Sequence, residues 1–75
     1  MANHVRPIAV SPAERAVLER LQRAPSTPAG LSRRARAVLL MAQGVSGVEI
    51  AERIGYTVVQ VSRIRRRYEI GRAHV

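Results

Sequence analysis

Apolar residues recur at helical spacing along most of the chain, and the pattern is clearest at residues 46–68. Ser46, followed three residues later by Glu49, predicts a helix start with a reciprocal capping box. The apolar face of this helix consists of Ile50, Ala51 and Ile54. Gly55 ends the helix, since a residue without Cβ suits a left-handed turn position.

A second helix follows the turn at once. Thr57 and Gln60 form another capping box at its start. Its buried stripe consists of Val61, Ile64 and Tyr68. Ala51 supplies the small side chain that a steep helix crossing needs. The pattern predicts a helix-turn-helix whose second helix is the candidate for the DNA major groove. The alternative is a plain helical hairpin in some other small bundle.

Two more helices are expected before this pair. Ser11-Pro12-Ala13-Glu14 predicts the start of a helix that runs to about Ala24. Its apolar face consists of Ala13, Val17, Leu18, Leu21 and Ala24. The next helix runs from about residues 29–31 to Gln43 and is ended by Gly44. Its core stripe consists of Leu31, Ala35, Val38, Leu39 and Ala42.

The expected fold is therefore all-α, with four short helices. The last three resemble a homeodomain-like three-helix unit, and the first is an extra N-terminal helix. Residues 1–10 are expected to form a flexible arm in which Ile8 and Val10 pack loosely on the domain, and residues 11–69 to form the domain itself.

The charge balance points to a polyanionic partner. Thirteen Arg residues oppose five Glu in 75 residues, a net charge of +8, and the chain contains no Lys, Asp or Cys. Double-stranded DNA is favoured over a membrane, because no helix pairs a bulky aromatic face with a basic one. No apolar run approaches the roughly 20 residues of a membrane span, and no signal peptide is evident, so a cytoplasmic protein is expected.

The helix-turn-helix pattern identifies the candidate DNA contacts. The expected base-contacting residues are Val58, Val59, Ser62 and Arg63. The expected phosphate contacts are Thr57, Arg65, Arg66, Arg67, Arg33, Arg34 and Arg36. The two valines have core packing as an alternative. For Arg33, Arg34 and Arg36 the alternative is a solvated helix face that contacts no partner.

Four segments carry a family resemblance: Ser-Pro-Ala-Glu-Arg at 11–15, Gly-Leu-Ser-Arg-Arg-Ala-Arg-Ala-Val-Leu-Leu-Met-Ala-Gln-Gly-Val-Ser at 30–46, Glu-Ile-Ala-Glu-Arg-Ile-Gly at 49–55 and Val-Ser-Arg-Ile-Arg-Arg-Arg-Tyr at 61–68. Over residues 8–69 the chain resembles the N-terminal DNA-binding region of bacterial insertion-sequence transposases of the mariner-like superfamily. The resemblance implies a longer protein with a further DNA-binding segment and a ribonuclease H-like catalytic domain, in which three carboxylates hold two metal ions.

This chain is not expected to be an enzyme by itself. Two-metal chemistry needs convergent carboxylates, and the chain has no Asp and five Glu on helices. We expect no cofactor, no metal and no small-molecule ligand. The expected function is recognition of terminal inverted repeats by a truncated transposase, acting in the bacterial cytoplasm at the nucleoid. A stand-alone helix-turn-helix transcription regulator and a non-functional gene fragment are the alternatives, and the DNA target and oligomeric state stay open.

The last residues, 70–75, are interpreted separately from the helical pattern of the rest of the chain. Glu69 to Val75 can be back-translated as GAG ATC GGA AGA GCA CAC GTC, which contains the start of a common sequencing-library adapter. We therefore expect a non-native tail from about residue 70, produced by read-through from a DNA fragment into ligated adapter. The alternative is a genuine short tail.

Overall fold

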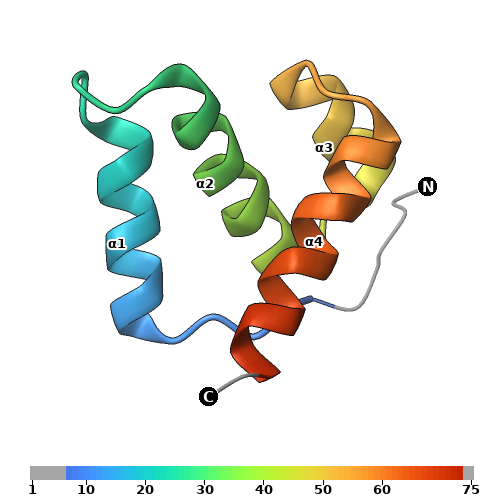
Figure 1. Ribbon diagram of the computed structural model, residues 1–75, viewed down its shortest axis with the longest axis horizontal. Helices are drawn as coiled ribbons and strands as arrows, with labels where there is room; N and C mark the ends of the chain where they lie inside the picture. The colour runs from blue at the N-terminus through green and yellow to red at the C-terminus, as the bar shows by residue number, and fades with distance from the viewer. Residues whose placement is uncertain (1–6, 74–75) are drawn as a thin grey trace.

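The computed structural model describes residues 7–73, in which four helices and no strand occur (Figure 1). The helices are α1 (Pro12–Arg23), α2 (Ala29–Ala42), α3 (Gly47–Ile54) and α4 (Val58–Ala73). The predicted all-α class is confirmed, and the ends of α1 and α2 lie within about a residue of those expected from the caps and breakers. No helix of the described part is long and apolar enough to cross a membrane.

Local side-chain hydrogen bonds explain where α1 begins. The Glu14 N–H donates to Ser11 Oγ at 3.1 Å, and the Ser11 N–H donates to Glu14 Oε1 at 2.9 Å. Pro12 occupies the first helical turn, where its missing N–H costs nothing. The predicted capping box of α1 is confirmed.

The prediction of a reciprocal capping box for α3 is only half right, because one of its two hydrogen bonds is formed and the other is not. The Glu49 N–H donates to Ser46 Oγ at 3.3 Å, as expected. The Glu49 carboxylate, however, accepts a hydrogen bond from the Arg53 guanidinium one turn later. An oppositely charged partner at i+4 thus takes the carboxylate that the box required.

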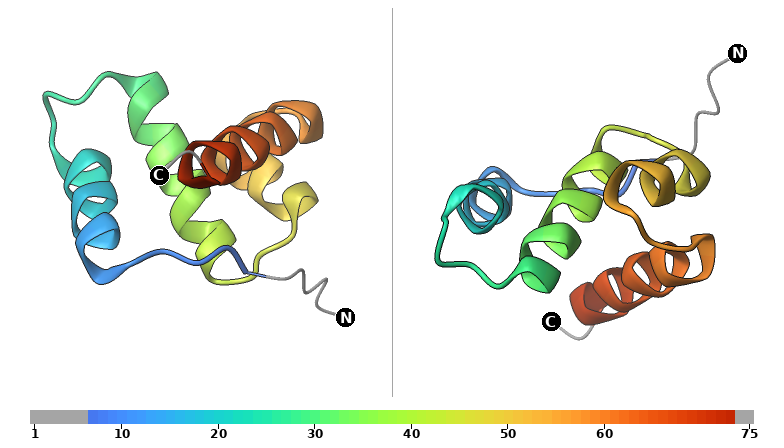
Figure 2. Two further views of the ribbon diagram at one scale, coloured as in Figure 1. Left: turned by 60° about the horizontal axis from the view of Figure 1, so that its bottom comes forward. Right: turned by 90° about the horizontal axis from the view of Figure 1, so that it is seen from above.

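Helix α2 lies in the middle of the molecule. Helix α1 packs along one side of it, while α3 and α4 pack on the other side and against each other (Figures 1 and 2). Along the described chain, α1 and α4 do not pack against each other. They are joined at one end, where the Tyr68 hydroxyl donates to Glu14 Oε2 at 2.9 Å.

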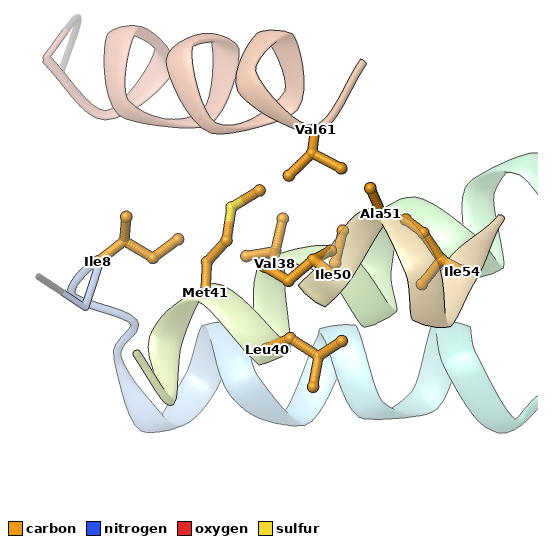
Figure 3. Close-up of a cluster of buried hydrophobic side chains, with 9 residues drawn as sticks. Ile8, Val38, Leu40, Met41, Ile50, Ala51, Ile54 and Val61 are labelled. Carbon is orange, nitrogen blue, oxygen red and sulfur yellow. The ribbon is translucent and has the colours of Figure 1, made fainter. Parts of the chain in front are cut away.

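The core lies where α2, α3 and α4 meet. Its buried residues are Ile8, Ala37, Val38, Leu40, Met41, Ile50, Ala51, Ile54 and Val61 (Figure 3). Ile64 and Tyr68 are half-buried against this cluster. The apolar faces predicted for α3 and α4 are therefore confirmed. The arm contributes more than expected, because Ile8 is fully buried and its N–H lies 3.4 Å from the Met41 carbonyl oxygen.

The apolar faces predicted for α1 and α2 need correction. No residue of α1 is fully buried, and both Ala13 and Val17 are exposed. In α2, Leu31 is 39% exposed, and the buried set is Ala35, Ala37, Val38, Leu40 and Met41. Helix α1 packs along α2 alone, whereas α2 has neighbours on several sides, so the buried surface of α2 extends well beyond a single stripe.

The residues expected to form a non-native tail partly continue α4. Its helical backbone runs on to Ala73, and the Ile70 side chain is exposed. Residues 74 and 75 lie outside the described residues. The origin of residues 70–75 in adapter read-through stays a prediction, since a helical backbone does not bear on it.

The turn between α3 and α4 depends on one glycine. Gly55 has φ 76° and ψ 29°, the left-handed conformation, and its N–H donates to the Ala51 carbonyl. The Tyr56 N–H donates to the same carbonyl oxygen at 3.0 Å. Ala51 itself is buried and points toward α4 in the close-up (Figure 3). The chain thus turns within three residues, as the helix-turn-helix pattern requires.

Gly55→Val is expected to destabilise the domain by about 1–2 kcal/mol, because a β-branched residue resists the left-handed conformation. A Cβ at this position would meet nothing within 4 Å, so backbone strain is the only cost. Gly47→Ala is the matched control: its Cβ would lie 3.8 Å from Val61 Cγ1, an ordinary contact. Thermal melts should separate the two variants, and a Gly55→Val protein as stable as the parent would contradict the turn assignment.

Candidate nucleic-acid interface

The first turn of α4 is fixed by a complete capping box. The Gln60 N–H donates to Thr57 Oγ1 at 3.1 Å, and the Thr57 N–H donates to Gln60 Oε1 at 2.8 Å. This prediction is confirmed: the box uses Thr57 Oγ1 and Gln60 Oε1 as acceptors. The next residues project outward: Val58 is 47% and Val59 60% exposed. Core packing therefore does not account for either valine.

Helical periodicity separates α4 into two faces. Val61 is buried, and Ile64 and Tyr68 are half-buried against the core. Val59, Ser62, Arg63 and Arg66 lie away from that face, and all are exposed. Three of the four residues predicted to contact bases, Val59, Ser62 and Arg63, thus lie on the outer side of the second helix of the helix-turn-helix, and the fourth, Val58, one turn before the buried Val61, is also exposed.

Most of the arginines of this helix are available to a partner. In the part of the chain that the structure describes, Arg63, Arg66 and Arg67 are exposed and form no ion pair with a carboxylate. Arg65 differs: it is half-buried, and its Nε lies 3.6 Å from Glu69 Oε2. Its charge is partly balanced within the protein, so it is less well placed than its neighbours for a phosphate.

The three arginines predicted on α2 do not form one surface. Arg33, Arg34 and Arg36 are all exposed. Arg34 lines a hollow together with Arg63 and Arg67 of α4, whereas Arg33 and Arg36 lie outside it. The structure therefore brings one arginine of α2 close to the second helix of the helix-turn-helix and leaves the other two elsewhere on α2.

This hollow was not foreseen from the sequence. It has a volume of about 590 Å³ and lies over α2, between α1 and α4. Its larger apolar lining residues are Leu18, Leu21, Leu31, Val38, Ile64 and Tyr68. Each of these residues was predicted to lie in the apolar stripe of its helix. A stripe by itself does not reveal where part of α2 stays accessible between α1 and α4.

Within residues 7–73 no three His, Cys, Asp or Glu side chains gather in a way that could hold a metal ion. What the described surface offers is an exposed, basic outer face on the second helix of a short two-helix turn. The fold and this face together define a helix-turn-helix domain, a class that typically binds DNA.

Comparison with known families gives the same result. Residues 28–74 match the family of homeodomain-like domains, a family found in transposases. The match covers more than half of the 75 residues, so the chain belongs to this family. It comprises α2, α3 and α4 and leaves α1 outside. Neither the curated proteins nor the solved structures yield a match.

Thr57→Ala should loosen the start of α4 by removing the acceptor for the Gln60 N–H. A lost cap costs about 1 kcal/mol, and fraying should be confined to the first turn, where Val58 and Val59 lie. Hydrogen exchange should accelerate, relative to the rest of α4, at Gln60 and Val61, whose N–H groups donate to the Thr57 side chain and carbonyl. Thr57→Ser keeps the acceptor oxygen and should behave as the parent. Unchanged exchange in Thr57→Ala would contradict a structural role for this cap.

Proposed function

We propose that the domain binds double-stranded DNA sequence-specifically, with α4 lying in the major groove. The observation that carries the proposal is the exposed outer face of α4, in which Arg63, Arg66 and Arg67 have no carboxylate partner among the described residues. A helix fits the major groove, and unpaired guanidinium groups match both guanine edges and phosphates.

Base contacts are assigned to the first two turns of α4. Arg63 is the residue for a bidentate contact to the O6 and N7 atoms of guanine. Val58 and Val59 are placed to touch thymine methyl groups, and Ser62 to hydrogen-bond a base edge. Their common feature is exposure on the side of α4 that does not face the core.

Phosphate contacts are assigned to residues around this surface. Arg66 and Arg67 lie further along α4, toward the groove wall, and Thr57 lies at its start. Arg33, Arg34 and Arg36 of α2 complete the proposed set. Arg65 should contribute less than these, because the nearby Glu69 carboxylate already balances part of its charge.

We also infer that the DNA is a terminal inverted repeat and that the domain serves transposition. Two observations support this: the resemblance of residues 8–69 to mariner-like transposases and membership of a family found in transposases. In this proposal the domain supplies recognition, and strand cleavage belongs to a separate catalytic domain of the kind that the resemblance implies. Such a role would place it at the nucleoid in the bacterial cytoplasm.

The division between base and phosphate contacts can be tested with single substitutions. A duplex is first selected from a random library, and each variant is then titrated against it and against a scrambled duplex at several salt concentrations. Arg63→Ala should weaken the selected site by about 1–3 kcal/mol and the scrambled duplex much less. Arg66→Ala or Arg67→Ala should weaken both duplexes alike and reduce the salt slope by about one ion.

Arg20→Ala serves as the matched control, since Arg20 is exposed on α1, far from the helix-turn-helix in sequence. It should leave both affinities close to those of the parent. If Arg63→Ala lowers both affinities equally, Arg63 contacts phosphate only. If no duplex is enriched from the random library, binding is not sequence-specific and the proposed function is wrong.

A further inference from the structure

The hollow over α2 has the composition of a docking surface. Its floor is formed by α2 and its two walls by α1 and α4, and Leu18, Leu21, Leu31 and Ile64 are among its lining residues. Leu31 is 39% exposed although it sits in the apolar stripe of a helix. At about 590 Å³ the hollow has the size of a binding site rather than a packing defect.

The charges around the hollow carry a single sign. Arg34 lines it from α2, and Arg63 and Arg67 line it from α4. No carboxylate is among the described residues that line it. At one end the lining residue Tyr68 donates its hydroxyl hydrogen bond to the Glu14 carboxylate. An occupant must therefore combine apolar surface with negative charge.

The arrangement of the helices specifies the shape of that occupant. Helices α1 and α4 are close at the end where Tyr68 meets Glu14 and diverge toward the other end (Figure 1). Both pack on α2 and neither packs along the other; of the α2 residues that line the hollow between them, Ala35 and Val38 are buried, while Leu31 and Arg34 stay exposed. A largely apolar trough between diverging helices is a site in which an amphipathic helix can dock through residues at i, i+3, i+4 and i+7.

We propose that this trough binds an amphipathic helix of a partner protein, one whose apolar stripe is flanked by Asp or Glu. The apolar stripe covers Leu31 and the leucines of α1, and the flanking carboxylates pair with Arg34, Arg63 and Arg67. This interaction goes beyond DNA binding. The peptide interaction also affects DNA binding. The bound helix engages Arg63 and Arg67, which the proposed DNA complex needs, so the helix and the DNA compete for the domain.

The probe is a synthetic helical peptide of about 16 residues, with leucines on one face and glutamates on both flanks. Binding to the full chain without DNA is followed by fluorescence anisotropy and by the shifts of backbone amide NMR signals. Saturable binding should shift signals around Leu18, Leu31 and Ile64 and leave those of α3 unchanged. Addition of the peptide to a preformed DNA complex should release the DNA.

Two pairs of variants test the trough itself. Leu31→Asn should raise the Kd for the peptide about tenfold, through loss of apolar contact. Val48→Asn is the matched control, because Val48 is 55% exposed on α3 outside the trough. Arg34→Ala should weaken binding about threefold at low salt, while Arg20→Ala on α1 should not. Circular dichroism melts confirm that each variant is folded.

Further probes give outcomes that overturn the proposal. If polyglutamate without leucines binds as well as the peptide, the arginines are acting as a general anion surface. If a leucine peptide with glutamine in place of glutamate binds as well, the charge complementarity is wrong. If the shifts fall on α3, or Leu31→Asn binds normally, the trough is not the site. These results do not depend on DNA, so they are separable from any failure of the proposed DNA binding.

Discussion

The left-handed turn at Gly55 is the constraint on which the arrangement of α3 and α4 depends. The carbonyl of Ala51 accepts hydrogen bonds from the N–H groups of both Gly55 and Tyr56, which closes the turn in the fewest residues. The buried Ala51 side chain then lets α4 approach closely enough for Val61 to enter the core (Figure 3). The orientation of α4, and hence the outward position of Arg63, follows from this short segment.

For α2, α3 and α4, how well the buried residues could be predicted from the sequence depends on how many helices pack against each one. Helices α3 and α4 each have one apolar face, so Ile50, Ile54 and Val61 could be read from periodicity alone. Helix α2 contacts α1, α3 and α4, and a single-stripe interpretation missed Ala37 and Met41, two of its most deeply buried residues. The number of neighbours is a tertiary property that no local spacing encodes.

Competition between side chains explains why the candidate site was only partly predictable. The sequence indicates which positions of α4 face outward, but not which charges are already paired. Glu69 balances Arg65, and Arg53 takes the Glu49 carboxylate from the expected capping box. In both ion pairs the two residues are four positions apart on one helix. Such a pair competes with the capping hydrogen bond expected for Glu49 and with the phosphate contact expected for Arg65. Arg66 and Arg67 lack such a partner among the described residues.

Helix α1 shows how an addition to a small domain can create a new surface. The homeodomain-like match begins after it, so the three-helix unit is defined without α1. Helix α1 packs on α2 through the half-buried Leu18 and Leu21 and is joined to α4 by the Glu14–Tyr68 hydrogen bond, so it buries part of α2 and leaves Leu31 and Arg34 exposed in the trough. Because α1 packs along α2 and meets α4 at one end, Leu31 stays accessible in the trough that Arg63, the arginine proposed to read DNA, also lines.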